Sequence, residues 1–459
     1  MNTITVGKSD EGQSVLLGQY ANRHGLIAGA TGTGKTVTLM MLAEGFSRMG
    51  TPVFMADVKG DMAGLAMSGN DNPKILKRAN DIGIEDFKFD ANPVSFWDLW
   101  NNNGNPIRTS VESIGATLMA RMLDLSDAQE GVLDVAYHYA RTNRISLNTL
   151  RDFRLLLSGM AQERETISTE YGLITSASIG AIQRRLLTLE NDGIDNFFGT
   201  PSLDIDDFMQ VKDGKGIINI LSAESLILRP RMYSTFLLWL LSELFNKMPE
   251  VGDVEKPKLV FFFDEAHLLF DDCPSELLRR VEQVVRLIRS KGIGVYFCSQ
   301  NPNDIPETVL GQLGNRFQHA LRAFTPRDQK AVRAAAETFV PNPNFEVTDV
   351  ITRLGVGEAL TSMLDSNAIP QAVQRTKISP PQCRLGTITE QERKSIVNND
   401  PLQEKYNPVP EIDISDLYED YHDDEDYDDD DDIDEVVEKP KNVFWKDFIN
   451  NLFMLNKNA

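Results

Sequence analysis

The residues best suited to chemistry in this sequence lie at positions 29–36, which read Gly-Ala-Thr-Gly-Thr-Gly-Lys-Thr. This string has the form G-x-x-x-x-G-K-[ST] of a phosphate-binding loop. Its glycines let successive backbone N–H groups converge on a polyphosphate, where a Cβ atom would obstruct the approach. The ammonium group of Lys35 suits the β and γ phosphates, and the hydroxyl group of Thr36 suits Mg²⁺. We therefore expect a nucleotide site formed by Gly29, Ala30, Thr31, Gly32, Thr33, Gly34, Lys35, Thr36 and Thr38.

The segments on either side of this loop have the patterns of a strand and a helix. An apolar run at residues 26–28 precedes the loop, and apolar residues follow it at helical spacing through residues 37–46. A helix that begins near Lys35 directs its positive end at the same anion. This order of strand, loop and helix favours a phosphate site over an incidental glycine-rich turn.

Two adjacent acidic residues, Asp264 and Glu265, follow five apolar residues at positions 259–263. Such a run is typical of a central parallel strand that is covered on both faces. Asp264 is placed to hold Mg²⁺ through water, and Glu265 to take a proton from a water molecule in line with the γ-phosphate. His267, two residues further on, either orients Glu265 or is a core histidine.

Two further polar residues end predicted strands and are candidates for the same site. Gln300 follows a strand predicted at residues 293–298, and its amide could bond the γ-phosphate or the attacking water. Asp57 follows a strand predicted at residues 52–56, and ligands of open α/β sheets bind at the carboxyl ends of strands. Ordinary turns also use these residue types, so both alternatives stay open.

Arginines are the remaining candidates, because nucleotide hydrolysis usually requires one on the transferring phosphate, from the same chain or a neighbouring subunit. Three arginines precede or begin predicted strands: Arg23, Arg289 and Arg316. A second basic group is either a solvated helix face or a nucleic-acid contact, and consists of Arg279, Arg286 and Lys291.

The acidity of the chain is concentrated in one segment. The net charge is -22, but residues 411–438 contain 17 acidic residues and no Lys or Arg, so the remainder carries -5 and nucleic acid is not excluded as a partner. The three cysteines lie far apart, which argues against a zinc site or a disulfide framework and fits a reducing compartment. Without an apolar run of 18 residues or a leader pattern, we expect no membrane span and a cytoplasmic location.

The spacing of the motifs indicates the organisation of the chain. Lys35 and Asp264 are 229 residues apart, far more than a few strand–helix pairs of about 30 residues each would need. We predict an α/β fold: a P-loop NTPase core with a mainly parallel sheet between helices, interrupted by a helical insertion. The predicted parts are core at 1–108, helical insertion at 109–200, core at 201–340, an extension packing on the core at 341–410, a disordered acidic tail at 411–440 and an amphipathic helix at 441–459.

Together these motifs resemble those of the HerA-like branch of the HerA-FtsK superfamily, over about residues 5–385. The resemblance rests on four strings: Asn-Arg-His at 22–24, the loop at 29–36, Asp-Glu-Ala-His at 264–267 and Ser-Gln-Asn-Pro at 299–302. The string Asp-Val-Lys-Gly-Asp at 57–61 is similar to a bacterial HerA-like family long labelled as a domain of unknown function.

The resemblance implies a RecA-like core of the class with an additional catalytic glutamate, usually assembled as a hexameric ring. In such rings ATP and Mg²⁺ lie between subunits, and DNA passes through the central channel. By position, Arg23 would match an arginine that a neighbour inserts in trans, Arg289 an arginine acting near the γ-phosphate, and Gln300 the polar sensor.

The resemblance does not extend to every feature of the family. HerA proteins carry an N-terminal β-barrel that docks a partner nuclease, whereas 28 residues precede Gly29 here, so the resemblance does not imply a nuclease partner. The function favoured is an ATP-hydrolysing, ring-forming motor that acts on DNA. The competing hypothesis is a nucleotide-dependent switch that binds a protein partner through the helical insertion or the terminal helix.

Overall fold

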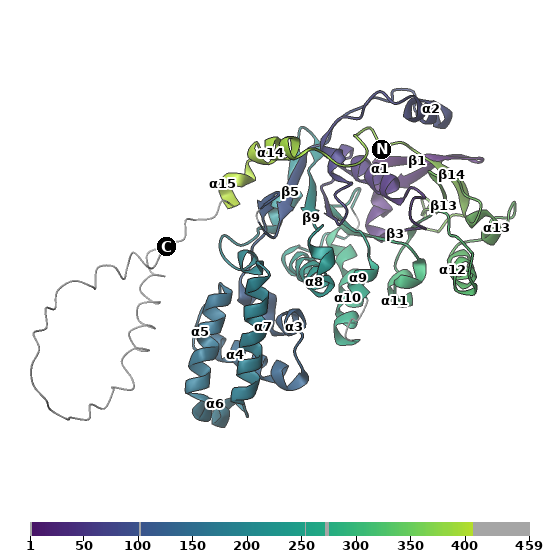
Figure 1. Ribbon diagram of the computed structural model, residues 1–459. Helices are drawn as coiled ribbons and strands as arrows, with labels where there is room; N and C mark the ends of the chain where they lie inside the picture. Colours follow the sequence, from purple (N-terminus) through teal and green to yellow (C-terminus); the bar gives the residue numbers. More distant parts are fainter. Residues whose placement is uncertain (1, 101, 253, 271–274, 407–459) are drawn as a thin grey trace, which may run out of the picture. The chain divides into compact units, whose positions relative to one another are not determined.

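A long mixed β-sheet organises this protein in the computed structural model, which describes residues 2–100, 102–252, 254–270 and 275–406 (Figure 1). The predicted acidic tail at 411–440 and the predicted terminal helix at 441–459 lie outside these residues. Among the described residues the sheet has twelve strands, in the spatial order β2 (Gly12–Leu17), β1 (Thr3–Ser9), β14 (Gln374–Ile378), β13 (Glu358–Ser362), β12 (Asn315–Gln318), β3 (Gly25–Ala28), β11 (Ile293–Ser299), β10 (Leu259–Phe263), β4 (Val53–Asp57), β9 (Ile218–Ser222), β5 (Val94–Asp98) and β6 (Asn105–Pro106).

The direction of the strands divides this sheet into two parts. From β12 to β6 each strand runs parallel to its neighbours, whereas β13, β14, β1 and β2 pair in antiparallel fashion beyond β12. A separate antiparallel ribbon joins β7 (Val211–Lys212) to β8 (Lys215–Gly216). The parallel part contains β3 and β10, so the loops that carry the two predicted motifs leave the same edge of the sheet.

Helices cover both faces of the parallel part. Helix α1 packs on one face, and α8 and α10 pack on the other. The helices of the described residues are α1 (Lys35–Arg48), α2 (Pro73–Ile82), α3 (Val111–Met122), α4 (Asp127–Thr142), α5 (Leu150–Gln162), α6 (Arg164–Tyr171), α7 (Ser176–Asn191), α8 (Pro230–Lys247), α9 (His267–Phe270), α10 (Ser275–Ile288), α11 (Glu307–Leu310), α12 (Pro326–Glu337), α13 (Val347–Ile351), α14 (Glu390–Asn398) and α15 (Leu402–Tyr406). The prediction of a mainly parallel sheet between helices is confirmed.

Strand β10 shows how the sheet divides the core. Val260 and Phe262 belong to the hydrophobic cluster that includes α1, whereas Phe261 and Phe263 belong to the cluster that includes α8 and α10. Successive side chains of a strand point to opposite faces, so an uninterrupted apolar run is needed when both faces are covered. This coverage is the reason that residues 259–263 contain no polar side chain.

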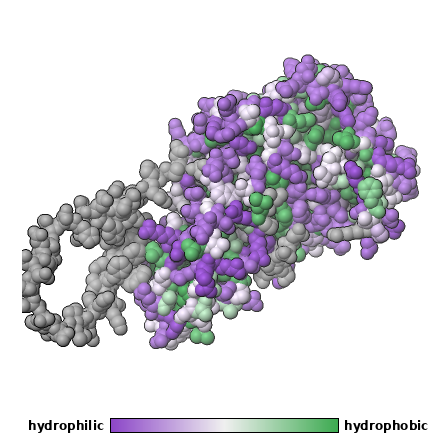
Figure 2. Space-filling model, in the orientation of Figure 1, coloured by the Kyte–Doolittle hydropathy of each residue, from purple (hydrophilic) through white to green (hydrophobic). Residues whose placement is uncertain are grey.

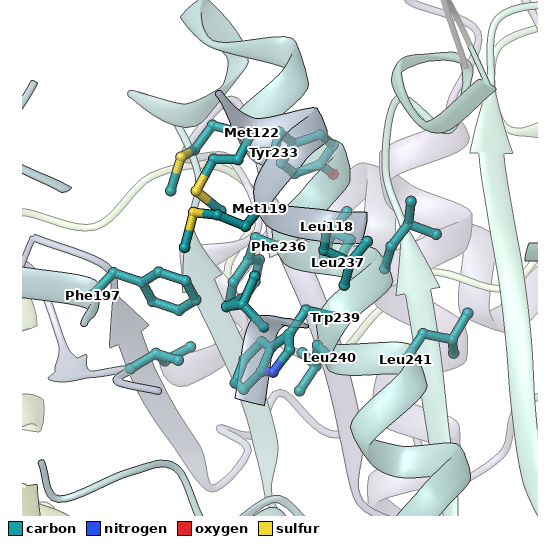
Figure 3. Packing of buried hydrophobic residues seen from close by; sticks show 14 of the residues in the cluster. Leu118, Met119, Met122, Phe197, Tyr233, Phe236, Leu237, Trp239, Leu240 and Leu241 are labelled. Carbon is teal, nitrogen blue, oxygen red and sulfur yellow. The ribbon is translucent and has the colours of Figure 1, made fainter. Parts of the chain in front are cut away.

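Helix α8 joins the helical segment α3–α7 to the sheet. Figure 3 shows a cluster of buried side chains from α3 and α8, together with Phe197. The indole N–H of Trp239 also donates to the hydroxyl of Ser113 at 3.2 Å. On the same helix, the hydroxyl of Tyr233 donates to the backbone oxygen of Asp264 at 2.9 Å. One helix therefore contacts both the helical segment and the end of β10.

Individual strands also differ from their predicted bounds. The strand predicted at residues 52–56 is β4, Val53–Asp57, and the one predicted at 293–298 is β11, which extends to Ser299. Strand β12 starts at Asn315, which stands opposite Gly25 of β3 and whose side-chain amide donates to the backbone oxygens of Tyr20 and His24. The division into core, insertion and extension stays a prediction.

The surface is largely hydrophilic in the view of Figure 2, with hydrophobic side chains scattered between the polar ones. Leu173, Leu228 and Phe324 are examples of large apolar side chains that are more than four-fifths exposed. Within the described ranges, every helix is too short or too polar to cross a membrane.

Candidate active site

The predicted phosphate-binding loop connects β3 to α1. Two glycines meet steric demands that other residues could not. A Cβ atom on Gly29 would lie 2.5 Å from the Cβ atom of His319, and Gly34 has a φ of 112° immediately before the helix begins. Helix α1 begins directly after the loop. The N–H groups of its first turn have no hydrogen-bond acceptor within the helix and are available to an anion at the loop. Thr31 and Gly32 are exposed at its tip, where an anion can approach.

The side chain of Lys35 lies over this loop. Its ammonium group donates to the backbone oxygens of Gly29 at 2.7 Å and Ala30 at 3.2 Å, and the Thr33 hydroxyl donates to Ala30 at 2.7 Å. Thr38 is fully buried, with its hydroxyl 2.9 Å from Nε2 of His319. These contacts hold the loop in shape, and nucleotide contact by Thr38 stays a prediction.

The acidic residues Asp264 and Glu265 lie past the end of β10, which β11 separates from β3. Both are buried, with exposed fractions of 7% and 5%. Burial, together with the charge of Glu265, raises the pKa of Asp264 to about 6. A bound cation would favour the ionised form of this carboxyl group, so Asp264 suits the metal role predicted for it.

Three side chains converge on the carboxylate of Glu265. The Lys59 ammonium group lies 2.8 Å from Oε1, while Nε2 of Gln300 and Nδ1 of His267 each lie 3.4 Å from Oε2. Burial acts to raise the pKa of Glu265, but the hydrogen bond and charge of Lys59, together with His267 and Gln300, hold that pKa below its ordinary value. Glu265 also has a φ of 47°, which is uncommon for a residue other than glycine.

These contacts bring Gln300 and Glu265 together, as the sequence indicated. They also favour an orienting role for His267 over a place in the core. Lys59 is the contact that the sequence reasoning missed. A cation between two acids, directly after the strand predicted at residues 52–56, was the signal that could have found it.

Asp57 ends β4, the other neighbour of β10, and is 1% exposed. Its two carboxylate oxygens accept from the backbone N–H groups of Lys59 at 3.3 Å and Met62 at 3.0 Å. Burial is the main cause that raises the pKa of Asp57 to about 7. The observed role of Asp57 is to shape the turn that carries Lys59, and its contact with a nucleotide or metal stays a prediction.

The candidate arginines lie at the opposite edge of the sheet. Arg23 ends a 3-10 helix just before β3, and Arg289 begins another just before β11. The seven residues of β11 span about 23 Å at 3.3 Å per residue. Arg316, in β12, donates to the backbone oxygens of Leu310 and Leu313. The fold therefore separates these arginines from Lys35 and Glu265 within one subunit.

The predicted basic group is also divided. Arg279 and Arg286 are exposed on α10. Lys291 is 9% exposed, and its ammonium group donates to the backbone oxygen of Met248 and lies over the ring of Phe245. The prediction that Lys291 joins the other two is wrong, because its charge is used inside the fold.

His24 holds the segment that presents Arg23. Its Nδ1 accepts from the N–H of Val295 at 3.0 Å, so Nε2 carries the proton and donates to the oxygen of Val285 at 2.8 Å. Burial, helped by the charge of Arg289, lowers the pKa of His24 to about 4. The fold thus requires the neutral ring.

Replacing His24 should change how stability depends on pH. Between pH 6.5 and 4 the unfolded chain binds a proton at His24 that the folded chain does not, so folding weakens as the pH falls. Relative to His24→Gln, the wild type should lose about 2 kcal/mol of unfolding free energy between pH 7 and pH 5. Urea denaturation of both proteins at the two pH values measures this difference. If the two proteins differ in unfolding free energy by the same amount at pH 7 and pH 5, His24 is not held neutral by the fold.

The fold and the arrangement of these motifs define the class of protein. A phosphate loop after β3 and paired acids after β10, with β11 between them, form a RecA-like P-loop ATPase core. The sequence pattern of the helicase HerA-like C-terminal family matches residues 3–434, and the chain belongs to that family. This match confirms the resemblance to HerA-like proteins that the motifs indicated.

Known proteins with similar sequences include the DNA double-strand break repair helicase HerA of Pyrococcus furiosus. It is 23% identical over 367 residues, which cover 74% of this chain and 63% of the relative. The HerA helicase of Sulfurisphaera tokodaii is 28% identical over 116 residues, or 25% of this chain and 22% of that protein. The chain thus spans less than two thirds of the length of these relatives.

Solved structures with a similar fold include VirB4 of Thermoanaerobacter pseudethanolicus, with a TM-score of 0.53 and 16% identity. The likeness covers 82% of this chain and 96% of VirB4. The plasmid coupling protein TrwB, in complex with a non-hydrolysable ATP analogue, gives a TM-score of 0.52 at 16% identity and covers 80% of this chain and 87% of TrwB. These similarities support the fold.

Proposed function

We propose that this protein is an ATP-hydrolysing HerA-like ATPase that forms a homo-oligomeric ring and acts on DNA as a translocase or helicase. One observation carries the proposal: the loop that suits a triphosphate and the acid that suits water activation leave the same edge of one sheet. A cytoplasmic location remains an expectation from the sequence, and no nuclease partner is proposed.

Each residue of this edge has a role that its position supports. The loop N–H groups and Lys35 bind the phosphates, because the glycine-rich loop leads directly into the start of α1, where the first helical N–H groups are free of intrahelical bonds. Glu265 accepts a proton from the attacking water, since it is a buried carboxylate held in its ionised form. Gln300, whose amide lies beside Oε2 of Glu265, orients that water or contacts the γ-phosphate.

Thr36 and Asp264 would hold Mg²⁺. Thr36 lies in the first turn of α1, and Asp264 is a buried carboxyl group whose pKa is raised to about 6. These are oxygen donors, as Mg²⁺ requires, and the ion would supply positive charge to the phosphate oxygens. Asp57 is a further acid of this edge, although both of its oxygens already accept backbone hydrogen bonds.

The ring is inferred from the placement of the arginines. Arg23 and Arg289 lie at the amino ends of β3 and β11, away from the phosphate loop of their own chain. Either could reach a triphosphate bound to a neighbouring subunit, if copies pack with one edge of the sheet facing the other. A closed ring, which we propose to be a hexamer, repeats that contact around its axis.

The proposal that the protein acts on DNA is supported by the family and by the names of relatives that are DNA repair helicases. The rate of ATP hydrolysis, measured with and without double-stranded DNA, tests this part of the proposal. We expect DNA to raise the rate, and Lys35→Ala to abolish hydrolysis in both conditions. A rate that DNA leaves unchanged would favour the nucleotide-dependent switch, in which the protein binds a protein partner instead.

A further inference from the structure

We propose that Lys59 is a positioning residue for Glu265, anchoring one carboxylate oxygen so that the other faces the phosphate loop. The inference rests on the proposed ATPase function and adds a residue to its machinery. Lys59 contributes to water activation through Glu265, and it does not itself contact the nucleotide.

The order of the strands places the contacts of Glu265 on two sides. Lys59 comes from the turn after β4, whereas Gln300 comes from the end of β11, and β10 lies between these two strands. The strand β11 also lies between β10 and β3, so Gln300 is on the side of the phosphate loop. Lys59 therefore holds Glu265 from the far side of the site.

The two carboxylate oxygens of Glu265 are held unequally. Oε1 is bonded to the Lys59 ammonium group at 2.8 Å, which is a short, charge-assisted contact. Oε2 is approached by Gln300 and His267 at 3.4 Å each. The stronger bond fixes Oε1, and the longer contacts leave Oε2 able to accept a hydrogen bond from water.

Burial makes this anchor effective. The Glu265 side chain is 7% exposed, while the Lys59 side chain is 47% exposed. Water competes weakly for a carboxylate in such surroundings, so the ammonium group is a dominant partner. Rotation of the carboxylate away from the loop would break this bond with little hydration in return.

The turn that presents Lys59 is itself constrained. In the β4–β10 pair Val53 lies opposite Val260, and the same offset carried forward sets Asp57 opposite Asp264. Asp57 then accepts the N–H groups of Lys59 and Met62, and Gly60 adopts a φ of 71° between them. This geometry directs the chain after β4 across the end of β10. The buried carboxylate of Asp57 therefore helps to place Lys59 beside Glu265.

Replacing Lys59 by Met removes the charge and keeps most of the apolar stem. A misplaced catalytic group typically costs about 10²-fold in rate, so we expect kcat for ATP hydrolysis to fall by about 10- to 100-fold. The KM for ATP and the affinity for a fluorescent non-hydrolysable ATP analogue should stay near the wild-type values. Lys59→Arg should recover part of the loss, because it keeps a cation at this position.

The control is Lys394→Met, which removes a lysine paired with Glu390 on exposed α14 and should leave kcat unchanged. A second comparison uses Glu265→Gln as the background. If Lys59 acts through Glu265, adding Lys59→Met to Glu265→Gln should lower kcat no further. Thermal unfolding of each variant verifies that the fold is intact.

Three results would overturn the inference: an unchanged kcat, with or without a raised KM; a raised kcat; and a further loss in the Glu265→Gln background. A raised kcat would mean that Lys59 restrains Glu265, and a raised KM that it binds the nucleotide. Failure of the proposed function is distinct, because the wild-type protein would then not hydrolyse ATP.

Discussion

Glu265→Gln should bind ATP as the wild-type protein does and hydrolyse it about 10²- to 10⁴-fold more slowly. The substitution keeps the size of the side chain, and an amide still accepts a hydrogen bond from Lys59, but it cannot take a proton from water. Binding of a fluorescent ATP analogue and single-turnover hydrolysis, measured on the same preparation, separate the two steps.

A matched control is Glu165→Gln on α6, where the carboxylate is 92% exposed and far along the chain from the site. This variant should hydrolyse ATP at the wild-type rate. Normal hydrolysis by Glu265→Gln would remove Glu265 as the base and leave the site without an assigned proton acceptor.

Arg23→Ala should lower kcat by about 10³-fold or more when every subunit carries the change, as arginines acting on a transferring phosphate typically do. We expect Arg23 to act on the nucleotide of a neighbouring subunit, because it lies across the sheet from the phosphate loop of its own chain. Its guanidinium group rests near the ring of Tyr20 in the isolated chain and would extend into the site of the next subunit.

Mixing wild-type and Arg23→Ala subunits tests the sharing of this arginine. Suppose that each site needs the arginine of a neighbouring subunit and that the subunits of the ring hydrolyse ATP one after another. The activity of the mixture should then fall more steeply than the fraction of wild-type subunits. Arg185→Ala, on α7 and about half exposed, is the control for mixing and should leave activity unaffected. If activity instead falls in strict proportion to the fraction of wild-type subunits, Arg23 does not act in the site of a neighbouring subunit.

Local sequence was sufficient for the phosphate loop and for the acidic strand end. The loop at 29–36 is contiguous, and its glycines, lysine and hydroxyl act within a few residues of one another. The five apolar residues before Asp264 identify a doubly covered strand, because only such a strand needs apolar side chains on both faces. Gln300 could likewise be placed, as the residue that ends the next strand in the chain.

Tertiary structure decided which cation lies beside Glu265. Lys59 reaches Glu265 because β4 pairs with β10, although 206 residues separate the two in the sequence. Lys291 had the pattern of a surface cation, yet it lies inside the fold over Phe245. Spacing along the chain carries no information on either outcome, since strand order and helix packing set them.

The sequence by itself determined the groups available for chemistry in this protein: a loop that suits phosphates, an acid that suits a metal ion and a candidate base beside it. The tertiary structure decided the direction in which each group acts. It brought Lys59, Gln300 and His267 onto one carboxylate, and it set Arg23 and Arg289 at the far edge of the same strands. The physical reason is that a motif is made by neighbours along the backbone, whereas a site is made by neighbours across a sheet, whose order depends on the packing of the whole core.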